Sequence, residues 1–115
     1  ELSSIDDIQF MPENEWDDPN CWLSCITLHG KISPDDVIDA LEKENIESRP
    51  IWKPMHLQPY FEEYDYIGDR VSEKLFENGV CLPSDTKMTE KDLERVINVI
   101  RKCFLDSMQE YNHFV

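Results

Sequence analysis

The sequence predicts a small α+β domain in which a mostly antiparallel sheet is covered by helices on one face. Three observations support this fold class. The chain has 115 residues, which allows one modest domain, and 40% of them are hydrophobic, which is enough for a core. Short runs of β-branched and aromatic residues also alternate with segments whose apolar residues recur at helical spacing.

The N-terminal part of the chain predicts an edge segment followed by a strand. The first twenty residues contain seven acidic residues and no Lys or Arg, so residues 1–14 are interpreted as an acidic lead-in that forms no helix. A turn at Asp18-Pro19-Asn20 then precedes residues 21–28, which are rich in aromatic and β-branched side chains and end before Gly30. We predict a strand there.

A helix is expected from residue 34 to about residue 45. Ser33 provides an N-cap hydroxyl, Pro34 suits the first helical position, and two acidic residues in the first turn favour the helix dipole. Residues 46–51 then return to extended structure, because their pattern no longer has the helical period.

Two further helices are expected in the second half. One spans residues 71–78 and ends at Gly79, which is expected to form a left-handed C-terminal cap before a short strand at 79–83. The last helix has the clearest start, because Thr89 lies three residues before Asp92 and the two can form a capping box. Its apolar stripe consists of Leu93, Val96, Ile97 and Ile100.

These elements predict one domain over residues 15–104, after the lead-in at 1–14. Residues 105–115 are interpreted as a tail, because they show no strong apolar period. Its aromatic residues Tyr111 and Phe114 are expected either to pack on the domain or to lie free.

Charge excludes several classes of function. The chain has 25 acidic and 11 basic residues, so its formal net charge is -14. A protein this negative repels phosphate backbones, and we therefore expect no nucleic-acid partner. With 31% charged residues and no apolar run near 20 residues, we expect no membrane partner either.

The four cysteines are expected to be reduced thiols, because a chain with helices and a core does not depend on disulfides. With no secretory signal at the start, this interpretation places the protein in the cytoplasm. Cys21 and Cys25 lie on one face of the predicted strand, but together with His29 their spacing matches no compact zinc motif. We interpret these two cysteines as buried small hydrophobic residues and expect no metal site.

The segment 48–61 carries the candidate site. It contains no Asp or Glu in this acidic chain, and it combines aromatic rings with three residues that can bind an anion or a hydroxyl group: Arg49, Lys53 and His56. Three prolines make the segment stiff and extended, as in a preorganised ligand-binding wall. Arg49 and Lys53 suit a phosphate or carboxylate, and Trp52 suits stacking on a sugar or base.

A simpler interpretation of the same segment remains open. Trp52 and Met55 could fill the core, while Arg49 and Lys53 pair with acidic residues elsewhere, since apolar and aromatic side chains are mostly interior.

Several motifs, in order and spacing, resemble the C-terminal small domain of the DegT-type sugar aminotransferases. One of them, Trp52-Lys53-Pro54-Met55-His56, is similar to the form found in the branch of this family that aminates UDP-linked 4-keto-6-deoxy sugars. The matching segments are Glu47–Pro59, Trp22–Leu28, Ser72–Gly79, Cys81–Ser84 and Met88–Leu93. The resemblance covers about residues 15–104 and departs from the common pattern at Asp85, where relatives usually have Gly.

The resemblance implies a pyridoxal-phosphate enzyme of the aspartate-aminotransferase fold. Such an enzyme passes an amino group from glutamate to a nucleotide-linked keto sugar, here for a surface glycan, and the parent protein would be a cytoplasmic homodimer. By the same resemblance Arg49, Trp52, Lys53 and His56 would face the substrate, with His56 as the strongest candidate for a sugar or phosphate contact.

The resemblance also implies that this chain is inactive alone. The family's Schiff-base lysine, its pyridine-binding acid and its phosphate-binding residues belong to a large N-terminal domain, which no segment here matches. We therefore expect no catalytic residue and no productively bound pyridoxal phosphate in this chain. The alternative is a stand-alone, non-catalytic binding module. A separated domain should leave a large exposed apolar patch, whereas a stand-alone module should not.

Overall fold

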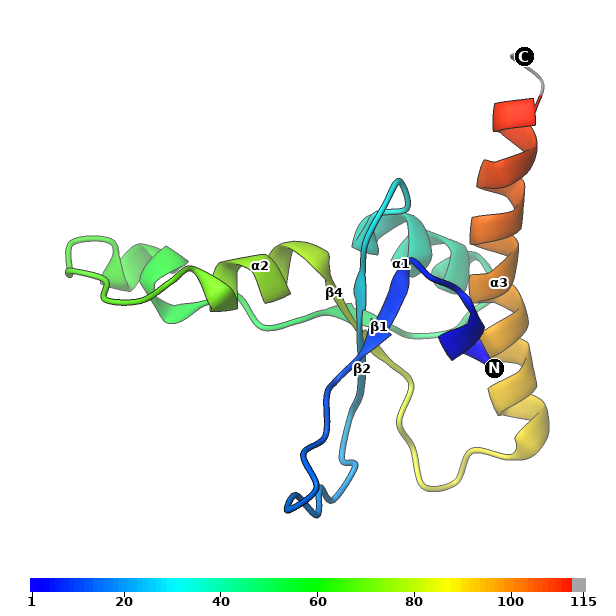
Figure 1. The fold of residues 1–115 in the computed structure, drawn as a ribbon, viewed down its shortest axis with the longest axis horizontal. Coiled ribbons are helices and arrows are strands. Elements are labelled where there is room, and N and C mark those ends of the chain that lie inside the picture. Colours follow the sequence, from blue (N-terminus) through cyan, green and yellow to red (C-terminus); the bar gives the residue numbers. More distant parts are fainter. Residues whose placement is uncertain (113–115) are drawn as a thin grey trace.

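The computed structural model describes residues 1–112, and their side chains as far as residue 106. Its centre is a sheet of four strands, β1 (Ile8–Phe10), β2 (Ser24–Leu28), β3 (Arg49–Pro50) and β4 (Gly79–Leu82). The spatial order is β1-β2-β4-β3, and each neighbouring pair is antiparallel (Figure 1).

Two helices cover one face of this sheet. Helix α1 (Pro34–Lys43) packs against α3 (Glu90–Asn112), and both lie on the same side of β1, β2 and β4 (Figure 1). The third helix, α2 (Val71–Asn78), extends away from the other side and leads directly into β4. The predicted α+β class, with helices on one face, is confirmed.

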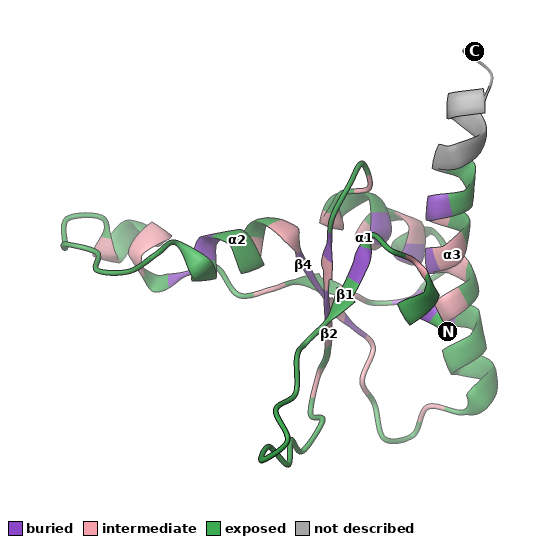
Figure 2. Ribbon diagram, in the orientation of Figure 1, coloured by how far each residue is buried: buried purple, intermediate pink, exposed green. Residues whose placement is uncertain are grey.

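The hydrophobic core lies between the sheet and these two helices. Side chains alternate between the faces of a strand, and Ile26 and Leu28 of β2 are buried while Thr27 between them is only half-buried. Figure 2 shows the buried positions concentrated in this half of the molecule. The core residues are Leu2, Ile8, Ile26, Leu28, Val37, Leu41, Ile46, Val80, Leu82, Val96, Ile100 and Phe104.

The predicted helix starts are confirmed in atomic detail. The hydroxyl oxygen of Ser33 accepts a hydrogen bond from the backbone N–H of Asp36, whose carboxylate accepts one from the Ser33 N–H at 2.8 Å. Hydrogen bonds from Ser33 to this carboxylate lower the pKa of Asp36. Thr89 and Asp92 make the same reciprocal pair at the start of α3, where hydrogen bonds from Thr89 lower the pKa of Asp92.

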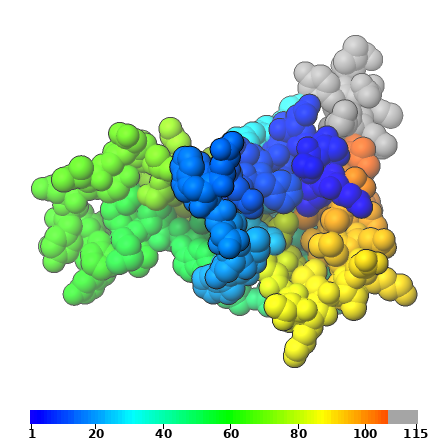
Figure 3. Space-filling view, turned by 60° about the horizontal axis from the view of Figure 1, so that its bottom comes forward, coloured from blue at the N-terminus to red at the C-terminus, as the bar shows by residue number. Residues whose placement is uncertain are grey.

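Residues 52–78 form a lobe that projects from the sheet. It contains two short 3-10 turns, η2 (Met55–Leu57) and η3 (Pro59–Phe61), followed by a loop and α2. In the space-filling view of Figure 3 the green lobe stands out from the body of the molecule. The prediction that this proline-rich segment is extended is wrong, because the chain folds into one turn directly after Pro54 and into a second turn that begins at Pro59.

Two predictions near the ends of strands are also wrong. Gly79 is extended, with φ -102°, and is the first residue of β4 instead of a left-handed cap. Glycine is needed there for space, because a Cβ atom would lie 2.4 Å from the Leu75 carbonyl oxygen and 2.2 Å from Ile51 Cδ1. Cys21 has φ 50° and lies outside β2, so it shares no strand face with Cys25, and its side chain is exposed.

The two ends of the chain are more regular than their sequence patterns indicate. The acidic lead-in contributes β1, an edge strand whose Ile8 pairs with Leu28. Helix α3 continues past residue 105 to Asn112. The packing predicted for Tyr111 and Phe114 lies outside the described side chains. No described helix is long and apolar enough to cross a membrane.

Candidate functional site

Three of the four predicted site residues line a cavity of about 780 Å³ where the lobe leaves the sheet. We call it the open-face pocket, because Cys81 in its wall points to the side of β4 opposite the core residues Val80 and Leu82. Arg49, Trp52 and Lys53 line it. The other lining residues are Trp22, Leu23, Glu47, Ser48, Pro50, Ile51, Phe76, Cys81, Leu82, Pro83 and Asp85.

The pocket combines exposed rings with two basic residues, Arg49 and Lys53, and two acidic ones, Glu47 and Asp85. Trp22 and Trp52 are 71% and 65% exposed, so the prediction that Trp52 fills the core is wrong. Arg49 has a local partner, since its Nε donates to the carboxylate of Glu47 at 2.7 Å. This ion pair is solvent-exposed and therefore weak, which leaves Arg49 able to exchange Glu47 for an anionic ligand.

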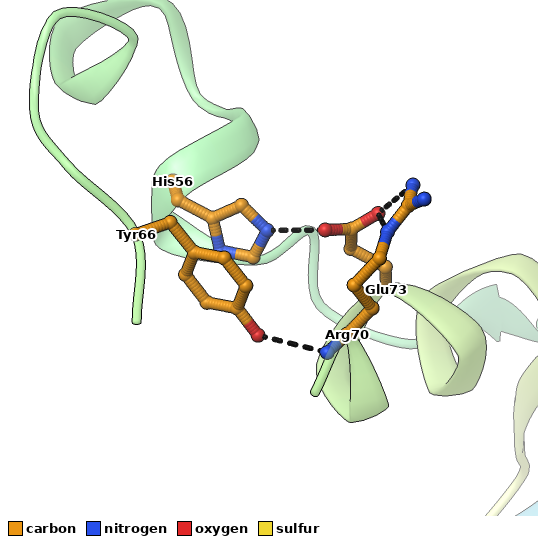
Figure 4. Close-up of polar contacts among 4 residues, drawn as sticks. All are labelled: His56, Tyr66, Arg70 and Glu73. Carbon is orange, nitrogen blue, oxygen red and sulfur yellow. Dashed lines mark hydrogen bonds and ion pairs between the residues drawn. The ribbon is translucent and has the colours of Figure 1, made fainter. Parts of the chain in front are cut away.

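His56 lies in a separate cluster inside the lobe, together with Tyr66, Arg70 and Glu73 (Figure 4). Its Nε2 is 2.9 Å from Glu73 Oε1, and its ring stacks on Tyr66 with 3.8 Å between ring centroids. Arg70 Nε donates to the other carboxylate oxygen of Glu73 at 2.8 Å, and the Arg70 backbone N–H donates to the Tyr66 hydroxyl oxygen. We call these four residues the His56 cluster.

The buried carboxylate of Glu73 organises the cluster. Glu73 is only 7% exposed, yet both of its oxygens accept hydrogen bonds from cationic or polar donors. Hydrogen bonding from Arg70, and secondly from His56, lowers the pKa of this carboxyl group. An ionised carboxylate can only accept, so the Nε2 of His56 must carry a hydrogen. In the neutral imidazole, Nδ1 is then an acceptor.

The structure thus separates the predicted residues into two places. Arg49, Trp52 and Lys53 share the open-face pocket, whereas His56 is bound to α2. Sequence reasoning missed Glu73 and Arg70 entirely. The available signal was weak: an Arg–Glu pair at i,i+3 is ordinary on a solvated helix surface. Among the described residues, no group of three or more His, Cys, Asp or Glu side chains could hold a metal ion.

Comparison with known proteins gives consistent results. A sequence model of the DegT/DnrJ/EryC1/StrS aminotransferase family matches residues 1–101. EpsN of Bacillus subtilis strain 168, which its name assigns as a pyridoxal phosphate-dependent aminotransferase, is 42% identical over 107 residues, covering 90% of this chain and 28% of EpsN. GDP-perosamine synthase of Caulobacter vibrioides is 33% identical over 78 residues, covering 66% of this chain and 21% of the synthase.

A solved structure that resembles this fold comes from the same family. The crystal structure of a DegT DnrJ EryC1 StrS aminotransferase from Brucella abortus superposes with a TM-score of 0.71 and 28% identity, over 88% of this chain and 26% of that protein. This chain therefore spans less than a third of the length of each of these three proteins.

Proposed function

Because this chain belongs to the DegT/DnrJ/EryC1/StrS aminotransferase family, we propose that it is the C-terminal small domain of an enzyme that aminates a nucleotide-linked keto sugar. The observation that carries the proposal is the 42% identity to EpsN over 90% of this chain but only 28% of EpsN. The likeness to a GDP-perosamine synthase supports a nucleotide sugar as the substrate class. Glutamate is the proposed amino donor, and a surface glycan the proposed destination.

The residues present do not by themselves fit pyridoxal phosphate. When bound, this cofactor supplies an electron sink and carries the amino group between donor and acceptor. Its lysine is activated in a desolvated pocket or beside another cation. All seven lysines of this chain are exposed, and the pocket lysine, Lys53, is no exception. The proposal therefore assigns cofactor binding and catalysis to the rest of the enzyme, and leaves this chain inactive alone.

The role proposed for this chain is to contact the substrate. Arg49 and Lys53 supply positive charge for the diphosphate of a nucleotide sugar, and the exposed ring of Trp52 supplies a stacking surface. For His56 the geometry supports a narrower role, because Glu73 fixes the imidazole with Nδ1 as the acceptor. His56 Nδ1 would accept a hydrogen bond from a sugar hydroxyl group.

The exposed side chains of the lobe support a domain of a larger protein over a stand-alone module. Eight large apolar or aromatic residues of the lobe are more than 40% exposed, among them Ile67 at 97%. Such a surface is typical of a face that another part of the protein covers. The eight are Trp52, Met55, Tyr60, Tyr64, Tyr66, Ile67, Val71 and Leu75.

The test uses the whole reading frame that encodes this chain. The purified protein, supplied with pyridoxal phosphate, glutamate and nucleotide-linked 4-keto-6-deoxy sugars, should convert a keto sugar to an amino sugar, as followed by mass spectrometry. The 115-residue chain alone should give no conversion. Sedimentation of the whole protein would test the proposed homodimer, and fractionation of cells its proposed cytoplasmic location. A reading frame without a further domain, and without conversion, would make a binding module the better conclusion.

The site residues need a test that separates substrate contact from folding. His56→Gln keeps an amide donor near the position of Nε2 and so retains the bond to Glu73, but it removes the acceptor Nδ1. We expect conversion by the whole enzyme to fall more than tenfold while its melting temperature changes little. Lys53→Ala should weaken nucleotide-sugar binding, with Lys74→Ala on the exposed surface of α2 as the matched control. Unchanged activity in both His56→Gln and Lys53→Ala would contradict the assignment.

A further inference from the structure

We propose that Cys25 and Cys81 are a paired oxidation site that closes to an intrachain disulfide across the open face of the sheet. The Sγ atoms of these two residues lie 3.4 Å apart, and both cysteines are free thiols. The pair is separate from the His56 cluster, and it does not depend on the proposed function of the chain.

The position of the pair in the sheet suits a disulfide. Cys25 of β2 and Cys81 of β4 are direct partners in the antiparallel register. Directly opposed residues in such strands have Cα atoms about 4.5–5.5 Å apart, which lies within the range of about 4.4–6.8 Å found in disulfides. The sulfur atoms must therefore approach from 3.4 Å to about 2.05 Å, a change that side-chain rotation can supply without a shift of the strands.

The pair is also reachable. Both side chains are half-buried and lie on the sheet face opposite the core, and Cys81 lines the open-face pocket. Burial, with the neighbouring Cys25 thiol, raises the pKa of Cys81 to about 11. The Cys81 thiol is therefore protonated at neutral pH, which makes Cys81 a slow nucleophile.

The reaction needs an oxidant, for which a low-molecular-weight disulfide such as glutathione disulfide is sufficient. One cysteine, as its thiolate, attacks a sulfur atom of glutathione disulfide and releases one glutathione thiolate, forming a mixed disulfide. The second cysteine then attacks the protein sulfur of that mixed disulfide and releases the second glutathione. In total the protein loses two electrons and two protons, and one glutathione disulfide becomes two thiols.

The other two cysteines provide internal controls. Cys21 is exposed, and Cys103 on α3 donates to the carbonyl oxygen of Val99 within its own helix. Neither has another cysteine as a hydrogen-bonding partner in the described structure. A glutathione adduct is therefore expected at Cys21 without an intrachain partner, and Cys103 is expected to remain a thiol.

The experiment is peptide mapping after oxidation, on this chain and on the whole protein that contains it. The protein is incubated with glutathione disulfide, remaining thiols are alkylated, and a non-reduced digest is analysed by mass spectrometry. We expect the Cys25–Cys81 peptide pair to exceed any other intrachain pair by about tenfold or more. In urea the preference should move to the Cys21–Cys25 pair, because that pair closes the shortest loop.

Three substitutions complete the test. Cys21→Ser should leave the cross-link intact, whereas Cys25→Ser and Cys81→Ser should each abolish it and leave the remaining thiol as a glutathione adduct or free. The proposal is wrong if Cys25 and Cys81 of the folded wild-type protein remain fully alkylated while Cys21 is oxidised. It is equally wrong if the cross-links are distributed among all four cysteines as they are in urea.

Discussion

The sheet with its two covering helices and the lobe at residues 52–78 are held by different forces. All twelve buried core residues belong to the sheet, to α1 and α3, to the segment between α1 and β3, or to the N-terminal turn Leu2–Ser4, and none lies in the lobe. The lobe is held by a buried charged residue, Glu73, and its hydrogen bonds to His56 and Arg70. Figure 2 shows the contrast, with burial concentrated on the side of α1 and α3.

The lobe is therefore specified mainly by polar contacts and buries little apolar surface of its own. Hydrophobic burial scales with the apolar area removed from water, and the lobe leaves most of its large apolar side chains exposed. Polar contacts of this kind fix a geometry but contribute little net free energy.

The same substitution in the two regions should have very different effects. Ile100 in α3 is fully buried, so Ile100→Ala removes core contacts and leaves a cavity, and should lower the free energy of unfolding by about 2–5 kcal/mol. Ile67 in the lobe is 97% exposed, so Ile67→Ala should change it by less than about 0.5 kcal/mol. Urea denaturation followed by circular dichroism measures both. Similar losses in the free energy of unfolding for Ile100→Ala and Ile67→Ala would show that the two regions do not differ in apolar stabilisation.

The junction between the regions should be nearly as sensitive as the core. Gly79→Ala places a Cβ atom against the Leu75 carbonyl oxygen, which is backbone and cannot rotate away, so we expect a loss of about 1–3 kcal/mol. The matched control is Gly68→Ala in the lobe, whose Cβ atom would meet the Tyr66 side chain, with the hydroxyl oxygen at 2.6 Å and Cζ at 2.9 Å, and no backbone atom among its nearest neighbours. That ring can move, so the control should cost under about 1 kcal/mol in urea denaturation.

Helix capping should matter in the packed region and not in the lobe. Ser33→Ala removes the side-chain cap of α1 and should lower the free energy of unfolding by about 1 kcal/mol. Helix α2 begins at Arg70 without a side-chain cap, so Ser72→Ala in its first turn should change that free energy by less than about 0.5 kcal/mol. Thermal unfolding of the two variants provides the comparison. A larger loss in Ser72→Ala would contradict it.

The sheet with its two helices is easier to predict from the sequence than the lobe, because its elements depend on local apolar patterns and caps, whereas the lobe depends on polar contacts between distant residues. The caps at Ser33 and Thr89 and the apolar stripe of α3 are local signals, and the structure confirms them, although Leu93 at the start of that stripe is exposed. The Glu73–His56 bond joins residues 17 positions apart, and neither residue type predicts the other. The turn after Pro54 and the turn that begins at Pro59 do not follow from the prolines, because proline restrains φ but leaves ψ open to either structure.

The last prediction concerns Glu73 and has the smallest expected effect on global unfolding. Its lowered native pKa means that the unfolded state binds the proton more tightly than the folded state. Its contribution is therefore complete above the ordinary glutamic acid pKa of 4.5 and is lost as the pH falls through the lower native value. Amide chemical shifts of residues 66–73, followed by NMR from pH 7 to pH 3, should move towards unfolded values at the acid end while those of α3 between residues 96 and 104 persist.

Substitution of the same residue isolates this effect from other acidic groups. Glu73→Gln lacks the charge that Arg70 and His56 contact, so residues 66–73 should already have the shifted amide signals at pH 7 and should change little on acidification. Glu77→Gln, one turn later on the exposed surface of α2, should behave like the wild-type chain. Native amide signals in Glu73→Gln down to pH 3 would mean that the lobe is held by its apolar contacts with the sheet. The lobe and the sheet region would then both be held mainly by apolar contacts and would differ only in how much apolar surface each buries.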